Sequence, residues 1–304
     1  MLSKTTSTHL CKAFGAVLSK RSCGICYRRP GARRLMVRNG EITMHPMHPV
    51  LAGCVSMVGF LVLSSVASAQ GKVIVFVGGA VTGIARQAGE ALTRGSGHSV
   101  VVVSDTTGSL QKRLEKERAD VMFAAAPAID ALEKAGRIVS GTRVDVARAL
   151  IGVGVRAGAP LPDLSTPETV RAALLKARSV AYVNPAAGGT SGTFFEGLLG
   201  RMGIAEAMKS KTVYRTQGSE VADAVAKGEA ELGITFTSEL QPNPGVRVAG
   251  TLPAAIQLPT IYSAGMMATA ENSEGARAFL RTLAGAEARA AVTKAGLEPI
   301  GPAR

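Results

Sequence analysis

The sequence predicts an α/β protein of two lobes, each a mostly parallel sheet flanked by helices. Over residues 70–304, short runs rich in β-branched residues alternate with longer runs of helical periodicity. The runs 73–77 and 100–103 are apolar throughout, which is typical of strands buried on both faces. Two turn-rich stretches rich in proline and glycine, 158–162 and 241–245, enclose a self-contained α/β unit and predict the boundary of a second lobe.

The elements follow in order along the chain. The expected strands are Val73–Val77, Ser99–Val103, Asp120–Ala124, Ala149–Val155, Ser179–Val183, Thr212–Tyr214, Glu231–Phe236 and a returning strand near Ile261–Ala264. The expected helices are Gly83–Thr93, Ser109–Arg118, Ala128–Ala135, Pro167–Ala177, Thr193–Met202, Glu220–Lys227, Ser273–Leu283 and Ala286–Ala295. Because the chain returns after the enclosed unit, we expect a discontinuous first lobe, residues 70–155 plus 250–304, and a second lobe of residues 156–249.

The amino-terminal segment reads as a leader rather than as part of the fold. Residues 50–69 form an uncharged apolar run that ends in Ala67-Ser68-Ala69, a small-x-small cleavage pattern. We therefore expect residues 1–69 to be a leader and signal peptide with cleavage near Ala69, and a periplasmic mature protein. The nearest basic residue lies well before the apolar run, so a start at an internal methionine is the alternative.

Removing this leader changes the composition. It holds nine of the 35 Lys/Arg residues and one of the 22 Asp/Glu residues, so residues 70–304 keep 26 and 21 and a net charge of +5. The high overall charge is thus no argument for nucleic-acid binding. All four cysteines lie in the leader, and the remaining chain has a single histidine, His98, in an apparent solvated turn. Zinc sites and Ser-His or Cys-His catalysis are nearly excluded, and we expect no cofactor.

Two loops rich in glycine and hydroxyl side chains precede expected helices, one in each lobe. They are Thr106-Thr107-Gly108-Ser109 and Gly188-Gly189-Thr190-Ser191-Gly192-Thr193. Free backbone N–H groups and hydroxyls at helix starts favour anions. The alternative is that both are ordinary helix caps, where serine and threonine are common anyway.

Several stretches in this order resemble one family over nearly the whole of residues 70–304. They are Val75–Thr82, Asp105–Leu110, Ala119–Ala125, Asn184–Thr193 and Gly228–Ser238. The chain is similar there to the molybdate-type periplasmic solute-binding proteins. The resemblance implies the two-lobed type II periplasmic binding fold, closure of the lobes around a small anionic ligand by hinge bending, and delivery to the permease of an ABC importer. A monomer is expected.

Departures from the family pattern bear on the ligand. The family places a serine where this chain has Ala80, and a tyrosine where it has Phe236, so two hydroxyl donors are missing. Because each unmet buried hydrogen bond costs about 1–3 kcal/mol, molybdate is disfavoured, and an organic polycarboxylate is the preferred anion over a tetrahedral oxyanion. The expected ligand-binding residues are Gly79, Ala80, Thr82, Thr106, Thr107, Gly108, Ser109, Ala125, Gly189, Thr190, Ser191, Gly192, Thr193 and Phe236.

Two other functions are open. The chain also resembles secreted aconitate isomerases, which shift a double bond in a tricarboxylate by moving a proton; Tyr182, Asp105, Glu196 and Lys72 are candidate acid/base groups, and the sequence does not choose among them. Enzymatic activity is the less favoured interpretation. A glycine-rich turn at residues 78–83 after a strand suggests dinucleotide binding, but its spacing differs from G-x-G-x-x-G.

Overall fold

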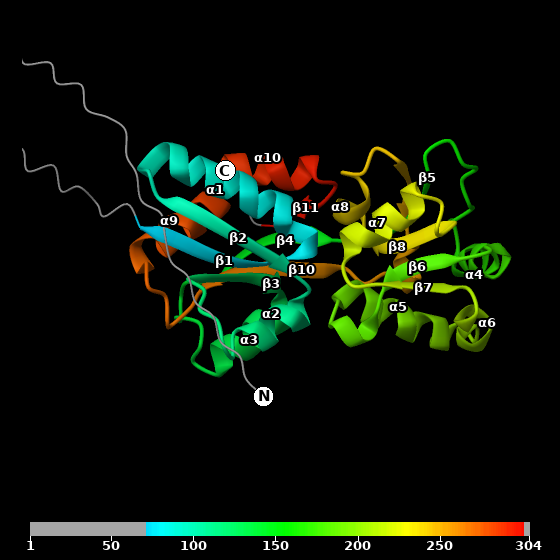
Figure 1. Cartoon of the computed structure of the whole chain (residues 1–304), viewed down its shortest axis with the longest axis horizontal. Coiled ribbons are helices and arrows are strands. Elements are labelled where there is room, and N and C mark those ends of the chain that lie inside the picture. The colour runs from blue at the N-terminus through cyan, green and yellow to red at the C-terminus, as the bar shows by residue number, and fades with distance from the viewer. Residues whose placement is uncertain (1–70, 301–304) are drawn as a thin grey trace, which may run out of the picture. The chain divides into compact units, whose positions relative to one another are not determined.

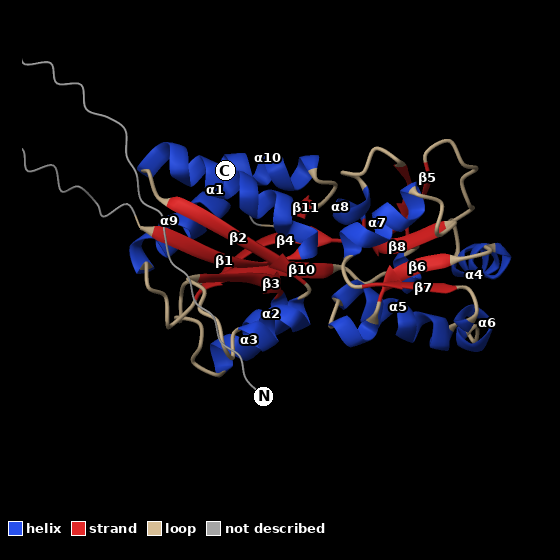
Figure 2. Ribbon diagram, in the orientation of Figure 1, coloured by secondary structure: helices blue, strands red, loops and turns tan. Residues whose placement is uncertain are grey.

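A computed structural model of the chain describes residues 71–300. The expected leader and the cleavage position near Ala69 lie outside the described residues. Within residues 71–300 the chain forms two β-sheets, each covered by helices on both faces (Figures 1 and 2). The α/β class predicted from the alternating apolar runs is confirmed.

The first sheet has six strands in the order β11-β4-β10-β3-β1-β2. Its strands are β1 (Lys72–Gly78), β2 (Ser99–Asp105), β3 (Val121–Ala125), β4 (Val144–Ala149), β10 (Thr260–Met266) and β11 (Glu298–Pro299). Its helices are α1 (Thr82–Ser96), α2 (Thr107–Arg113), α3 (Ala126–Lys134), α9 (Ser273–Leu283) and α10 (Ala286–Lys294), with a short 3-10 turn η1 (Gly79–Val81) after β1. Figure 1 shows α1, α9 and α10 on one face of this sheet and α2 and α3 on the other.

The second sheet has five strands in the order β7-β6-β8-β5-β9. Its strands are β5 (Ile151–Arg156), β6 (Val180–Val183), β7 (Thr212–Arg215), β8 (Leu232–Phe236) and β9 (Val246–Thr251). Its helices are α4 (Pro167–Lys176), α5 (Thr190–Arg201), α6 (Ala205–Lys209), α7 (Gly218–Ala226) and α8 (Thr237–Leu240), with a 3-10 turn η2 (Pro185–Ala187) before α5. Helices α7 and α8 cover one face, and α4, α5 and α6 the other (Figure 1).

Both sheets are mixed rather than mostly parallel, which corrects the prediction. The βαβ crossovers pair β1 with β2 and β3, and β6 with β7 and β8, in parallel. The strands that carry the chain between the lobes, β4, β5, β9 and β10, pair antiparallel. Antiparallel pairs need no crossover helix, so they leave no strand–helix alternation in the sequence.

The expected strand over 149–155 is two strands in different sheets. Strand β4 ends at Ala149 and β5 begins at Ile151, so one residue, Leu150, joins the sheets. The return link, residues 252–259, contains the 3-10 turn η3 (Ala254–Ile256). Sheet membership leads us to propose lobe boundaries at 150/151 and 251/252, a few residues from the 155/156 and 249/250 division expected from the sequence.

One side chain ties the two links together. The Gln257 amide oxygen accepts hydrogen bonds from the backbone N–H groups of Ile151 (2.9 Å) and Leu258 (3.0 Å). Its amide nitrogen donates to the carbonyl oxygens of Ile151 (2.9 Å) and Leu252 (3.2 Å). The polar side chain therefore satisfies backbone groups of both crossing segments where they pass each other.

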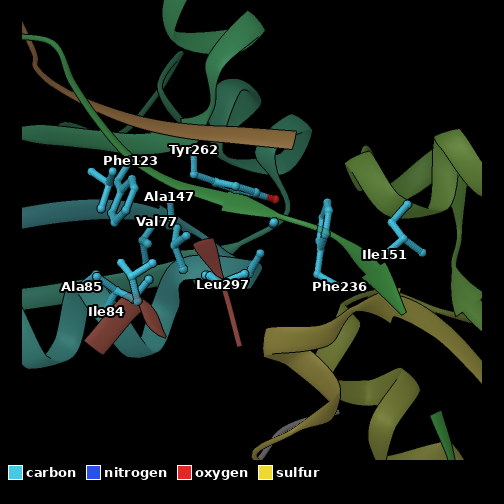
Figure 3. Close-up of a cluster of buried hydrophobic side chains, with 14 of the residues drawn as sticks. Val77, Ile84, Ala85, Phe123, Ala147, Ile151, Phe236, Tyr262 and Leu297 are labelled. Atoms are coloured by element: carbon cyan, nitrogen blue, oxygen red, sulfur yellow. The ribbon is translucent and has the colours of Figure 1, made fainter. Parts of the chain in front are cut away.

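Buried apolar residues run from one lobe into the other. Val77 and Phe123 of the first sheet pack with Ile84 of α1, and Phe236 of the second sheet belongs to the same cluster (Figure 3). At the junction the rings of Phe236 and Tyr262 meet edge to face, with centroids 5.7 Å apart.

His98 is buried, with its ring Nδ1 3.4 Å from the carbonyl oxygen of Gly71, so the expected solvated position for it is wrong.

Candidate functional site

The two glycine- and hydroxyl-rich loops meet across the lobes. The Gly108 N–H donates to the Gly188 carbonyl oxygen at 3.1 Å. The Thr106 hydroxyl donates to the carbonyl oxygen of Ala187 at 2.5 Å and accepts from the N–H of Ser109, whose own hydroxyl lies 3.4 Å from the same carbonyl. Direct bonds between the lobes at this point indicate a closed arrangement.

Behind these contacts lies a small cavity of about 20 Å³, enough for about one water molecule. Both lobes line it. Its residues are Gly79, Asp105, Thr106, Thr107 and Tyr262 from the first sheet's side, and Val183, Gly189, Thr190, Ser191, Gln217, Gly218, Phe236 and Glu239 from the second. None of these is basic, so an anion here would be held by hydroxyls, amide groups and helix starts.

The start of α5 supplies amide donors to this cavity. Gly189 precedes the helix without a side-chain cap, so the first-turn N–H groups of Thr190 and Ser191 lack the carbonyl partners of a helix interior. Gly192 lets this first turn approach β6, since a side-chain carbon there would overlap the carbonyl oxygen of Val183. Glycine at this position thus places the helix start against the cavity.

A larger cleft of about 790 Å³ adjoins the small cavity, and both share Gly79, Gln217 and Glu239 as walls. The first lobe contributes residues of η1, α1 and β2 to the cleft, and the second lobe contributes residues of α7, α8 and the turn after α8. Its charged side chains are Arg86, Asp223 and Glu239.

Glu239 stands between the two spaces. The hydroxyl of Thr235 donates to its Oε2 at 2.5 Å. A side-chain carbon at Gly79 or at Gly218 would overlap the Glu239 carboxyl group, so these two glycines, one from each lobe, leave the room that it occupies. Burial raises the pKa of Glu239 to about 7, although hydrogen bonds from Thr235 and from the Phe236 backbone act in the opposite direction.

Tyr262 brings a phenol to the same cavity from β10. The residue is 3 % exposed, its ring packs against Phe236, and its hydroxyl interacts with the Thr190 side chain across the lobes. Burial, with the negative charge of Glu239, raises the Tyr262 pKa well above its usual value. A tyrosine hydroxyl therefore reaches the cavity from a different strand than the one that carries Phe236.

The structure divides the residues expected at the site into four groups. Those that line the small cavity are Gly79, Thr106, Thr107, Gly189, Thr190, Ser191 and Phe236. Gly108 and Ser109 form lobe contacts, and Ala80 and Thr82 line the larger cleft, where the Thr82 and Ser104 hydroxyls are 2.6 Å apart. Ala125 (in β3 beside Tyr262), Gly192 and Thr193 line neither space.

Of the four acid/base candidates, Asp105 alone lines the small cavity, and its Oδ2 lies 3.9 Å from Arg113. Tyr182 and Glu196 bond to each other at 2.6 Å outside both spaces, and Lys72 begins β1. The groups missed from the sequence are Gln217, Gly218, Glu239 and Tyr262. The sequence offers only their positions as a signal: Gln217 and Gly218 follow β7, Glu239 follows β8, and Tyr262 lies in the returning strand β10.

The fold and this cleft are those of a two-lobed solute-binding protein. A model of the bacterial extracellular solute-binding protein family matches residues 73–298. The chain is also 32 % identical over 268 residues, 84 % of its length and 98 % of the relative's, to an aconitate isomerase from a Pseudomonas species. The chain therefore belongs to the family of bacterial extracellular solute-binding proteins.

Solved structures with the same fold include two anion-binding proteins. The periplasmic molybdate-binding protein of Azotobacter vinelandii matches with a TM-score of 0.60 and 21 % identity, over 76 % of this chain and 99 % of that one. The sulfate-binding protein of Mycobacterium tuberculosis matches with a TM-score of 0.61 and 16 % identity, over 76 % of this chain and 88 % of that one.

In residues 71–300 no helix is long and apolar enough to cross a membrane.

Proposed function

We propose that this protein captures a small organic polycarboxylate between its lobes in the periplasm and presents it to the permease of an ABC importer. The observation that carries the proposal is the small cavity where hydroxyls and helix-start N–H groups of both lobes converge without a basic side chain. Such neutral donors bind anions when they are preorganised at helix starts. The family and the anion-binding neighbours support this mode.

Size and charge favour a polycarboxylate over a tetrahedral oxyanion. The small cavity opens along Gly79, Gln217 and Glu239 toward a cleft of about 790 Å³, which has room for an extended carbon chain. Arg86 in that cleft offers a cation to a distal carboxylate. The carboxyl group of Glu239 on the cavity wall is unfavourable for a compact dianion, because such an ion must be surrounded by hydrogen-bond donors. The isomerase relative, named for a tricarboxylate, points the same way.

A second candidate function is isomerisation of the captured carboxylate. The observation that favours it is the pair of proton-bearing groups, Glu239 and Tyr262, on the wall of one cavity. Shifting a double bond by one carbon requires one proton to leave a carbon atom and one to reach another, with no change in oxidation state. A carboxyl group with a pKa near neutrality suits both steps.

A thermal-shift screen of residues 70–304 tests the capture proposal. Citrate, cis-aconitate and trans-aconitate are compared with molybdate, tungstate and sulfate, because ligands that bind the native state raise its melting temperature. We expect stabilisation by a tricarboxylate and at least about tenfold weaker binding after Thr107→Ala, which removes one hydrogen bond to a charged ligand. Stabilisation by molybdate or sulfate alone would contradict the polycarboxylate. Incubation with cis-aconitate then distinguishes a binding protein from an isomerase.

A further inference from the structure

We propose that Glu239 determines specificity by donating a hydrogen bond, in its protonated form, to a carboxylate of the ligand, so that capture takes up a proton. The proposal rests on the anion-capture function above. It assigns to one side chain both the preference for a carboxylate and a dependence of affinity on pH.

The Glu239 carboxyl group lies where the small cavity meets the larger cleft. Its Oε2 accepts from the Thr235 hydroxyl at 2.5 Å, and the other oxygen lies beside Gly79, at the boundary of the small cavity. Glycine at positions 79 and 218 leaves the carboxyl group its place between the lobes. Thr235 thus holds one oxygen, and the other lies at the boundary of the cavity in which a ligand would bind.

Four other titratable side chains line the two spaces that Glu239 borders. The titratable groups that line the same spaces are Tyr262 of β10, Asp105 at the end of β2, Arg86 of α1 and Asp223 of α7. Asp105 is near Arg113, and Asp223 accepts from Asn243. Within residues 71–300 no Lys or Arg forms an ion pair with Glu239. An ionised Glu239 would therefore repel an incoming anion, with no paired cation to offset its charge.

Protonation removes that conflict. A neutral carboxylic acid is a donor, and a ligand carboxylate is a good acceptor for it, whereas two carboxylates that share a site raise the proton affinity of the pair. Burial already raises the pKa of Glu239 to about 7 without ligand. A bound anion raises it further, so binding above neutral pH must draw a proton from solution.

Isothermal titration calorimetry with trans-aconitate at pH 5.5 and pH 8.5, in buffers of different ionisation enthalpy, measures both affinity and proton uptake. We expect wild-type affinity to fall about 30-fold between these pH values, as the protonated fraction of a group of pKa about 7 falls. The variant Glu239→Gln keeps an uncharged donor and is expected to bind at both pH values without that fall. Glu206→Gln, on the exposed helix α6, is the matched control.

Proton uptake by the wild type minus that by Glu239→Gln removes the ligand's own titration. We expect a difference approaching one proton at pH 8.5. Equal uptake in the two proteins, or equal wild-type affinity at both pH values, overturns the assignment while the capture function stands. If no tricarboxylate binds the wild type at either pH, the capture function itself fails. Circular dichroism of the variant, and retained pH dependence in Glu239→Asp, separate a fold defect from loss of the proton-binding group.

Discussion

Replacing Gly108 by alanine is expected to weaken ligand binding without weakening the fold. The new side-chain carbon would lie 2.8 Å from the Cα and 3.1 Å from the carbonyl oxygen of Gly188, both backbone atoms of the opposite lobe. Gly188 has a φ of +71°, which favours glycine and limits its freedom to give way. The lobes must therefore stay farther apart at this point than in the closed arrangement.

The magnitude follows from the bonds that such a separation breaks. The Gly108–Gly188 and Thr106–Ala187 hydrogen bonds are lost, and at about 0.5–1.5 kcal/mol each this destabilises the closed state by about 1–3 kcal/mol. Affinity then falls about 5- to 150-fold if the ligand binds the closed state. Stability moves the other way, because alanine in place of glycine within helix α2 stabilises it by up to about 1 kcal/mol.

Calorimetric titration with the ligand identified by thermal shift measures the affinity, and urea denaturation measures the free energy of unfolding. Gly200→Ala in α5 is the control, since a side-chain carbon there meets no atom within 4 Å. We expect it to alter stability alone. Wild-type affinity in Gly108→Ala would show that the loop contact does not belong to the binding-competent state, and the closure argument would be refuted.

Two predictions concern stability. Gly192→Ala places a carbon on the Val183 carbonyl oxygen, so we expect a loss of at least about 1–3 kcal/mol in urea denaturation; an unchanged midpoint contradicts the packing of α5 on β6. The pKa of Glu239 rises on folding from its ordinary 4.5 to about 7, so the native state binds the extra proton and the free energy of unfolding falls as pH rises from 4.5 to 7. Relative to Glu239→Gln, the fall is expected to be on the order of 3 kcal/mol, and parallel pH profiles of the two proteins would show that the carboxyl does not titrate there.

The sequence patterns predict the crossover strands as well as β5 and β10, but not β4 and β9, and the reason is physical. Each strand–helix unit shows a short apolar run followed by apolar residues at helical spacing, as in Val73–Val77 followed by the helix from residue 83. Strand β4 instead alternates charged and apolar residues, as in Val144-Asp145-Val146, and β9 begins with Val246-Arg247-Val248. Their partners lie in other parts of the chain, so no local turn announces them.

The site divides in the same way. Loops at helix starts can be recognised locally from their glycines and hydroxyl side chains, and the loops at 106–107 and 189–191 do line the cavity. Glu239 and Tyr262 have no such context, because they meet only where residues of the two lobes come together. Phe236 illustrates the limit: its missing hydroxyl is evident in the sequence, whereas the phenol of Tyr262 beside it depends on the pairing of β10 with β3.

The Gln257 amide has a mechanical consequence. Two hydrogen bonds of the Gln257 side chain, both to Ile151, join the two links. Sliding the links past each other would stretch both, whereas rotation about the point where they cross leaves both nearly intact. Sliding one lobe along the other therefore has a higher free-energy cost than rotating one lobe relative to the other. The two covalent connections therefore act as a single hinge axis, and the protein opens mainly by a change in the angle between the lobes.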